Sequence, residues 1–349
     1  VVTKDDLVIM GSEVGAVDVD PENIKFKGRL KPGKMFLVDT EEGRIIDDAE
    51  LKKEICSAQP YAKWLKDNVL ELSHLPKPAH VPETDFDSLL LRQKIFGYTT
   101  EDLNLLLTPM VADGVEASGS MGNDTPLAVL SDKPRLLYDY FKQIFAQVSN
   151  PPIDAIREEL VMSLTSRLGP QRNILEPGPE HARMLKLEHP VLSNEELAQL
   201  KELDNPDFYS ATVSILFDAE TGTDGLATAL SQLCRQAENA VKSGSAFLIL
   251  SDRGVGKEQV PIPALLAVAA VHHHLILKRN RYKIGIIVET GEAREIAHFC
   301  LLISYGAGAI NPYLAFETFE QMIKQKALPA ELTREKANEN YLKAIRKGM

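Results

Sequence analysis

The sequence contains few cysteines, a single tryptophan and no long apolar run. Its three cysteines, Cys56, Cys234 and Cys300, lie far apart and form no C-x-x-C pair. This spacing excludes a local zinc or iron–sulfur motif and favours a reducing compartment. The longest apolar stretch, residues 262–277, is interrupted by three consecutive histidines, so we expect no membrane span.

The sequence also has fewer basic residues than acidic ones. The chain has 39 Lys and Arg against 50 Asp and Glu, which gives a formal net charge of −11 and a pI near 5.3. An acidic chain without basic blocks is a poor candidate for binding nucleic acid or an anionic membrane, because phosphate neutralisation needs clustered Lys and Arg. We therefore expect neither partner. The 349 residues suffice for two domains, or for one large α/β unit with an appendage.

The first part of the chain has the pattern of short strands and turns. Residues 7–10, 24–30 and 34–39 are β-prone, and the turn around Gly43 leads into one more strand. About four short strands are too few for a stable domain, so this segment needs a partner surface. Helical spacing follows over residues 50–70, and then a proline-rich linker over residues 72–82.

The rest of the chain changes pattern near Tyr209. Before it, apolar spacing predicts helices over residues 89–107, 135–148, 153–168 and 194–203. After it, strands expected at 212–217, 246–250, 284–288 and 309–310 alternate with helices at 224–241, 262–277 and 293–304. Such alternation predicts an α/β fold with a parallel, incomplete-barrel-like or open sheet, preceded by the small β-rich segment. The residues after 316 have amphipathic helical spacing.

The stretch 116–130 is the most distinctive chemically. Two glycines, Gly119 and Gly122, stand among neutral polar residues, with apolar runs on both sides. Glycine permits positive φ or close approach to a ligand, and neutral polar groups suit a small polar molecule better than a phosphate or a metal. An ordinary tight loop capped by its own Asn and Asp is the alternative. The residues concerned are Gly119, Ser120, Gly122, Asn123, Asp124 and Thr125.

No catalytic constellation is apparent, and we assign no catalytic residue. Glu289 and Glu292 flank a turn near Arg294, which makes them either a weak acid/base pair or a capping arrangement at a helix start. The sequence after Asp252 lacks both phosphate-loop glycine patterns. The histidines at 272–274 are consecutive, and consecutive helical residues point about 100° apart, so we expect no metal site.

Several motifs closely resemble the glutamate synthase large (alpha) subunit. The segment from Gly119 to Ala128 matches its hallmark loop, and further matches extend over nearly the whole chain. They cover residues 95–102, 149–154, 289–292 and 305–315, residues 11–15, 27–33 and 38–39 near the start, and residues 340–348 at the end. The early matches resemble the last strands of that enzyme's glutamine amidotransferase domain. Those at the end resemble the lead-in to its FMN-binding domain.

The resemblance implies a domain organisation and a set of partners. Residues 1–68 would be the C-terminal strands of the amidotransferase domain, 69–94 a linker, and 95–349 the central domain, with its parallel β/α part at about 209–316 and C-terminal helices at 317–349. The chain would be an excised part of the enzyme, inactive alone. FMN and a 3Fe-4S cluster would belong to the missing domain, and this part would bind no cofactor. Ferredoxin or an NAD(P)H-dependent small subunit would supply electrons, in the cytoplasm or the plastid stroma.

The resemblance also implies a role for the loop. In such enzymes ammonia passes through an internal tunnel, which the central domain helps to form, and glutamine and 2-oxoglutarate become glutamate. Asn123 and Ser149 are the expected tunnel residues, although the family usually has threonine where Ser149 stands. The alternatives are a free-standing α/β-barrel enzyme using Glu289 and Glu292, and an independent structural or regulatory protein.

Overall fold

The computed structural model describes residues 1–13, 15–117, 126–142, 153–154 and 156–349. These residues separate into two compact units, Val1–Asp67 and Asn68–Met349. In the first unit β1 (Val2–Thr3) pairs antiparallel with β2 (Ile24–Phe26), and β3 (Leu37–Asp39) pairs antiparallel with β4 (Arg44–Ile46). A 3-10 turn, η1 (Pro21–Asn23), leads into β2.

Two helices end the first unit, where one helix over residues 50–70 was expected. Helix α1 (Asp48–Ser57) begins at Asp47, whose carboxylate accepts the Ala49 N–H at 2.8 Å, a typical N-cap. Helix α2 (Tyr61–Asn68) is separate, because Pro60 cannot continue the α1 hydrogen-bond pattern. The expected strand over residues 7–10 is also wrong, since only Val8 bridges to Val2.

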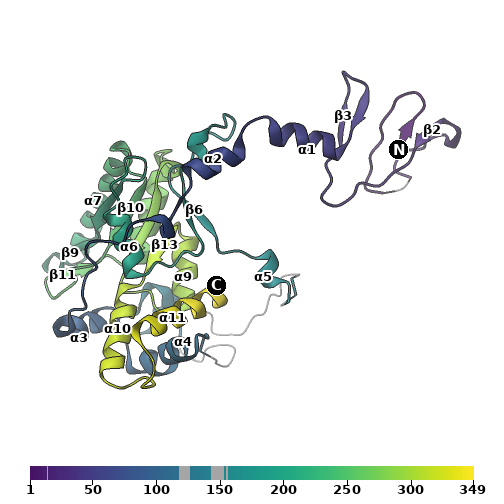
Figure 1. The fold of residues 1–349 in the computed structure, drawn as a ribbon. Helices are drawn as coiled ribbons and strands as arrows, with labels where there is room; N and C mark the ends of the chain where they lie inside the picture. The colour runs from purple at the N-terminus through teal and green to yellow at the C-terminus, as the bar shows by residue number, and fades with distance from the viewer. Residues whose placement is uncertain (14, 118–125, 143–152, 155) are drawn as a thin grey trace. The chain divides into compact units, whose positions relative to one another are not determined.

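An open parallel sheet organises the second unit (Figure 1). Its strand order is β13 (Ala309–Asn311), β12 (Gly285–Glu289), β10 (Phe247–Ser251) and β8 (Ser210–Ser214). The register places Ile249 opposite both Ile287 and Thr212. The predicted α/β fold with a parallel sheet is therefore confirmed, in its open form among the described residues.

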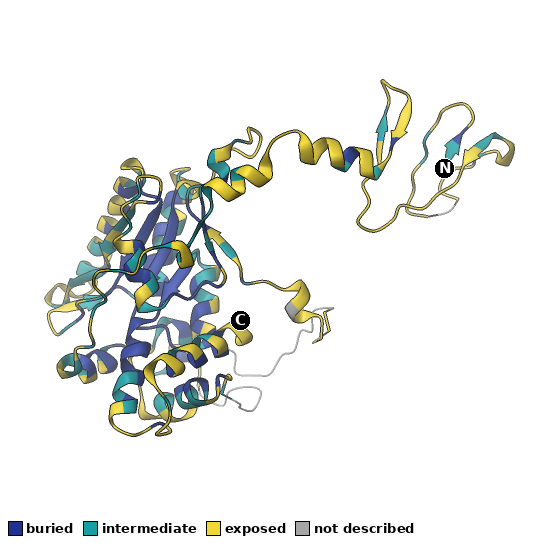
Figure 2. Cartoon of the chain, viewed as in Figure 1, coloured by how far each residue is buried: buried dark blue, intermediate teal, exposed yellow. Residues whose placement is uncertain are grey.

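Side chains alternate between the two faces of this sheet, as the period of a strand requires. On one face Leu248, Leu250, Ile286 and Val288 pack in a core with the helices α7 (Gly222–Lys242), α8 (Ala264–Leu277), α9 (Ile296–Ser304), α10 (Tyr313–Lys324) and α11 (Arg334–Gly348). On the other face Phe247, Ile249 and Ile287 pack in a second core with α6 (Asn194–Lys201) and β7 (Leu185–Leu187). Figure 2 shows the sheet buried between these layers.

Short elements complete the second unit. Strands β5 (Leu70–Glu71), β7 and β6 (Ser166–Leu168) form a three-stranded sheet, and β9 (Leu216–Asp218) pairs antiparallel with β11 (Gln259–Pro261). Helix α3 (Phe86–Ile95) is followed by Gly97, which has a positive φ. A π-helical stretch, η3 (Asp102–Leu107), leads into α4 (Thr108–Asp113). The remaining short helical turns are η2 (Leu72–His74), η4 (Ala128–Leu130), η5 (Leu137–Phe141), η6 (Pro179–Ala182), η7 (Ala219–Thr221) and η8 (Arg281–Lys283), together with α5 (Glu158–Val161).

Two predicted helices are wrong within the described residues. The helix expected over residues 135–148 is represented by the 3-10 turn η5, after which Lys142 is extended. The helix expected over residues 153–168 is reduced to α5, and its last residues form β6 instead. Ile156 is 93% exposed and Leu160 85% exposed. The apolar stripe there has no core to bury it, and short helices depend on such burial for their stability.

We predict a strong effect of truncating a side chain in the sheet. Leu248 in β10 is fully buried, so Leu248→Ala should lower the free energy of unfolding by about 2–5 kcal/mol, because it removes apolar contacts and leaves a cavity. Leu277 at the end of α8 is 81% exposed, and Leu277→Ala should have little effect. Urea unfolding followed by circular dichroism measures both; equal losses would contradict the layer assignment.

Candidate functional site at the strand ends

Polar residues gather where the central strands end. β10 ends at Ser251 and is followed by Asp252 and Arg253, while β12 ends at Glu289. The register pairs Ser251 with Glu289, and Glu289 with Asn311 at the end of β13. The carboxyl edge of an open α/β sheet is the usual place for ligand sites. Here most of these side chains are buried.

Glu289 is the centre of a charged network. Lys201 of α6 donates to its Oε2 at 2.7 Å, and the Ser251 hydroxyl donates to the same oxygen at 2.6 Å. Arg253 donates to the other oxygen. Burial by itself would raise the pKa of Glu289, but the positive charges of Arg253 and Lys201 outweigh burial and hold this pKa below its ordinary value. Glu289 is therefore an ionised, fully paired carboxylate.

The same network extends to α10 and α3. Arg253 donates from Nη1 to Glu317 at 3.1 Å, and Glu317 also forms a buried ion pair with Arg92 of α3. The Arg253 guanidinium lies 4.1 Å from the ring centroid of Tyr313, a distance suited to a cation–π contact. Two carboxylates from β12 and α10 are thus paired with three cations from α3, α6 and the loop after β10.

The pKa of Asp252 is shifted in the opposite direction to that of Glu289. Its carboxyl group accepts hydrogen bonds from the Thr290 hydroxyl at 2.6 Å and from the Gly291 N–H at 3.0 Å. No cation pairs with it among the described residues. Burial raises the pKa of Asp252 to about 8, against an opposing contribution from the Thr290 hydrogen bond. Asp252 is therefore mostly protonated at neutral pH.

Glu292 joins the strand edge to the start of α8. It accepts the backbone N–H of Ala264 at 3.0 Å, and burial raises its pKa to about 7. Glu292 therefore caps a helix, but this helix begins 28 residues earlier in the chain and is not the one that follows Glu292. Glu289 and Glu292 take part in different contacts, and their use as an acid/base pair stays a prediction.

Arg294 fixes the turn that follows α3. Its Nη1 donates to the Phe96 carbonyl at 3.1 Å and its Nη2 to the Gly97 carbonyl at 2.9 Å. The guanidinium also pairs with Asp102 at 3.1 Å and lies 4.3 Å from the Tyr98 ring centroid. The close approach of the two segments needs glycine at position 291, since a Cβ there would lie 2.4 Å from the Phe96 ring.

The residues just before 143–152 contact helix α9 and its N-cap. Lys142 pairs with Glu295 at 3.4 Å, and Glu295 also lies 3.1 Å from His298. The Tyr138 ring stacks on His298 with 4.2 Å between ring centroids. Before residues 118–125, Asn340 of α11 donates to the carbonyls of Val111 and Ala112 in α4. The two segments that precede residues 118–125 and 143–152, here called the stems, thus contact α11 and α9.

The candidate tunnel residues Asn123 and Ser149 lie outside the described residues. So do the residues expected to support them, which are Gly119, Ser120, Gly122, Asp124 and Thr125. The buried hydroxyl of Tyr98, whose ring lies against Arg294, has no hydrogen-bond partner among the described residues. The hydroxyl of Tyr138 lies beside Glu292, and that of Tyr313 lies beside Asp252. Buried polar groups normally have partners, so the Tyr98 hydroxyl could bind a water molecule.

Some important residues were not identified from the sequence. The glycine pattern shows only that Asp252 begins a glycine-containing loop. Its position directly after an apolar strand is the signal that marks it as a polar residue at a strand end. No sequence pattern indicates a role for Arg92, Lys201 or Glu317, because the residues with which they pair are distant in the sequence. The described residues contain no group of His, Cys, Asp and Glu that could hold a metal. In these same ranges no helix is long and apolar enough to cross a bilayer.

The fold and the site define an α/β protein with a buried polar network at the carboxyl ends of its parallel strands. Two family models match the chain: the glutamate synthase central domain over residues 91–349 and the class-II glutamine amidotransferases over residues 1–64. The chain belongs to the glutamate synthase large-chain family, and residues 91–349 form its central domain.

Relatives with several electron donors are similar over nearly the whole chain. The NADPH glutamate synthase large chain of Bacillus subtilis is 49% identical over 100% of this chain and 22% of its own length. The NADH glutamate synthase of Schizosaccharomyces pombe is 42% identical over 99% of this chain and 17% of its own. Ferredoxin-dependent glutamate synthase 2 of Arabidopsis thaliana, a chloroplastic protein, is 42% identical over 99% and 22%. The chain therefore spans about a fifth of the length of these relatives.

Solved structures contribute little to the comparison. The L230A mutant of flavocytochrome b2 with benzoylformate matches 33% of this chain and 28% of its own, with 17% identity and a TM-score of 0.28. A likeness this slight carries no argument.

We predict that Asp252 makes stability depend on pH. Its pKa is raised to about 8 in the folded protein from an ordinary 3.8, so the folded state holds a proton that the unfolded chain releases. The free energy of unfolding should therefore fall as pH rises from about 4 to about 8, by up to about 1.4 kcal/mol per pH unit. Asp252→Asn should remove this contribution and make the profile less steep, while the contribution of Glu292, whose pKa is raised to about 7, remains.

Urea unfolding at pH 5, 6, 7 and 8 measures the slope. Asp204→Asn, at an exposed position, is the matched control and should retain the wild-type slope. An Asp252→Asn profile as steep as that of the wild type would show that Asp252 is ionised throughout this range.

Proposed function

We propose that this chain connects the two catalytic parts of a glutamate synthase and helps to form the path that ammonia takes between them. The enzyme would convert glutamine and 2-oxoglutarate, with a reductant, to glutamate. The observation that carries the proposal is the succession of two family matches on one chain, an amidotransferase match over residues 1–64 and a central-domain match over residues 91–349. A chain with both matches would connect the amidotransferase domain, which would release the ammonia, to the central domain.

The domain assignment follows from the same observation. Residues 1–68 would be the last strands of the amidotransferase domain, residues 69–94 a linker and residues 95–349 the central domain. The first unit buries few of its apolar side chains; Phe26, for example, is 58% exposed. Strands with so little core of their own are consistent with a segment that completes a larger domain.

The geometry of the strand-end site favours a connecting role over catalysis by this region. Both oxygens of Glu289 are occupied by Lys201, Arg253 and Ser251. Glu292 is committed to the start of α8. A general base must reach the proton that it removes, and these contacts occupy both oxygens of Glu289 and one oxygen of the buried Glu292. We therefore propose that the region is inactive by itself, and the acid/base alternative has less support.

The cofactors and the electron donor would lie elsewhere in the enzyme. FMN and a 3Fe-4S cluster would be held by a further domain, and no step of the proposed role passes through them here. The relatives are named for NADPH, NADH and ferredoxin, so similarity does not choose among these donors. A cytoplasmic or plastid-stromal location would suit each of them.

We assign the ammonia path to residues 118–125 and 143–152, whose preceding stems contact α11 and α9. Lys142 and Tyr138 anchor one stem on α9, while Asn340 of α11 holds α4 before the other. Neutral polar side chains suit the passage of NH3, because they neither repel it nor trap it as ammonium. Asn123 and Ser149 are the residues we assign to this path.

Replacing Asn123 tests the assignment in the full-length enzyme. Asn123→Leu should lower the amount of glutamate formed per glutamine hydrolysed and release free ammonia, because an apolar group replaces the amide that would pass NH3 along. Glutamine hydrolysis itself should persist. Parallel assays of glutamine loss, glutamate formation and free ammonia measure this ratio.

Two controls accompany the experiment. Asn239→Leu makes the same change at an exposed position on α7 and should leave the ratio unaltered. Ser149→Thr introduces the residue usual in the family and should preserve it as well. If Asn123→Leu retained the wild-type ratio, Asn123 would not belong to the path.

A further inference from the structure

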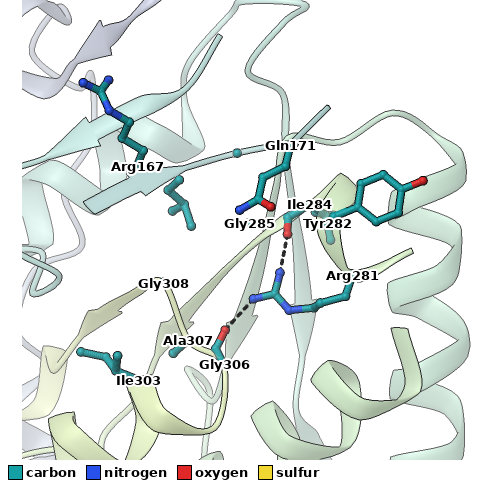
Figure 3. A pocket seen from close by; sticks show the side chains of 12 residues that line it. Arg167, Gln171, Arg281, Tyr282, Ile284, Gly285, Ile303, Gly306, Ala307 and Gly308 are labelled. Carbon is teal, nitrogen blue, oxygen red and sulfur yellow. Dashed lines mark hydrogen bonds between the residues drawn. The ribbon is translucent and has the colours of Figure 1, made fainter. Parts of the chain in front are cut away.

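A pocket lies at the amino edge of the parallel sheet, away from the strand-end network. Its volume is about 260 Å³. The start of β12, the glycine-rich turn before β13 and the end of β6 all contribute to it (Figure 3). The lining residues include the cations Arg167 and Arg281 and the polar residues Gln171 and Tyr282, but no carboxylate.

Arg281 is held rigidly in this pocket by neutral acceptors. Its Nε donates to His272 Nδ1 at 2.9 Å, its Nη1 to the Ile284 carbonyl at 2.8 Å and its Nη2 to the Gly306 carbonyl at 2.8 Å. Figure 3 shows the two carbonyl contacts. These bonds leave one N–H on each terminal nitrogen unused, because a guanidinium has five N–H donors. The side chain is thus fixed and still able to donate.

The charge of Arg281 is not balanced. The described part of the chain supplies no carboxylate within ion-pair distance of Arg281, and burial lowers the pKa of the guanidinium. This contrasts with the other half-buried and buried arginines of the second unit, since Arg92, Arg253 and Arg294 each pair with a carboxylate. A partly buried cation without a counter-charge is costly, and a bound anion would offset that cost.

The surroundings add to the positive potential. Residues 278–283 read Lys-Arg-Asn-Arg-Tyr-Lys, so four cations fall within six positions of a chain whose net charge is −11. Lys278, Arg279 and Lys283 are exposed and form no ion pair with any residue that the structure describes. Part of this charge complements the carboxyl end of α8, but the helix end offers only a fraction of one negative charge.

We propose that this pocket, with Arg281 as its fixed donor, binds a small oxyanion such as phosphate or a short dicarboxylate. The planar guanidinium suits the paired oxygens of either group. The volume of about 260 Å³ is below the range of roughly 300–1,000 Å³ typical of drug-sized ligands, which favours a small ion over a nucleotide. Glycine is needed at positions 285 and 308 in this wall, because a Cβ at either would lie within 2.6 Å of the Leu168 side chain. The proposal is independent of the ammonia path.

Calorimetric titration of the 349-residue chain with inorganic phosphate, and separately with succinate, tests the site. Chloride salt keeps the ionic strength constant, so a general charge effect is subtracted. We expect saturable binding of at least one of the two probes at one site per chain. The probe that binds identifies the source of the oxyanion, and absence of binding by both overturns the proposal.

Variants locate the binding. Arg281→Gln should weaken it by at least about tenfold, the loss expected when a charge-assisted hydrogen bond is removed. Arg235→Gln removes the same charge from an exposed position on α7 and should bind like the wild type. Equal affinity in Arg281→Gln and Arg235→Gln would overturn the assignment to this pocket.

Arg281 also supports the local backbone, so a second variant guards against loss of the fold. Arg167 lines the pocket but is exposed, and Figure 3 shows its guanidinium extending away from that of Arg281. Arg167→Gln should therefore leave the fold intact and weaken binding less than Arg281→Gln does. If Arg281→Gln does not fold, unchanged affinity in Arg167→Gln overturns the proposal and weakened affinity supports it.

Discussion

The burial of Glu289 and Glu317 is the constraint on which the second unit depends. A carboxylate taken out of water is stable only with partners, and removing one partner of such a pair is strongly destabilising. The partners here come from α3, α6 and the loop after β10. The need of each buried carboxylate for a cationic partner therefore brings these segments together at the ends of β10 and β12. The apolar layers bring the chain together, and the charges determine which segments meet.

The two edges of the sheet differ in how their buried charged groups are paired. At the carboxyl edge, each buried ionised carboxylate has cations beside it, and Asp252 avoids the cost of ionisation by keeping its proton. At the amino edge, Arg281 is bonded to carbonyl groups and a histidine, which satisfy its hydrogen bonds without cancelling its charge. At one edge every ionised carboxylate of the network is thus paired with a cation, whereas Arg281 at the other edge has no carboxylate beside it among the described residues.

Much of the parallel sheet could be predicted from the sequence, because its strands are short apolar runs between helical periods. The strand expected at 246–250 is β10 (Phe247–Ser251), and the helix expected from residue 262 begins at Ala264, directly after Pro263. The helix expected at 153–168 failed because periodicity does not reveal whether a core is present to bury Ile156 and Leu160. The strand ends were recognisably polar, but the partners of Glu289 were not predictable. Lys201 precedes it by 88 positions, and no local pattern encodes that contact.

The anchoring of the stems has a consequence for variation among related proteins. The contacts described there belong to Tyr138, Lys142 and the helices α9 and α11. These supports lie at chain positions separate from residues 118–125 and 143–152, so a homologue can carry a different sequence in those two stretches and keep the same flanking framework. The two stretches are therefore natural segments for exchange between homologues.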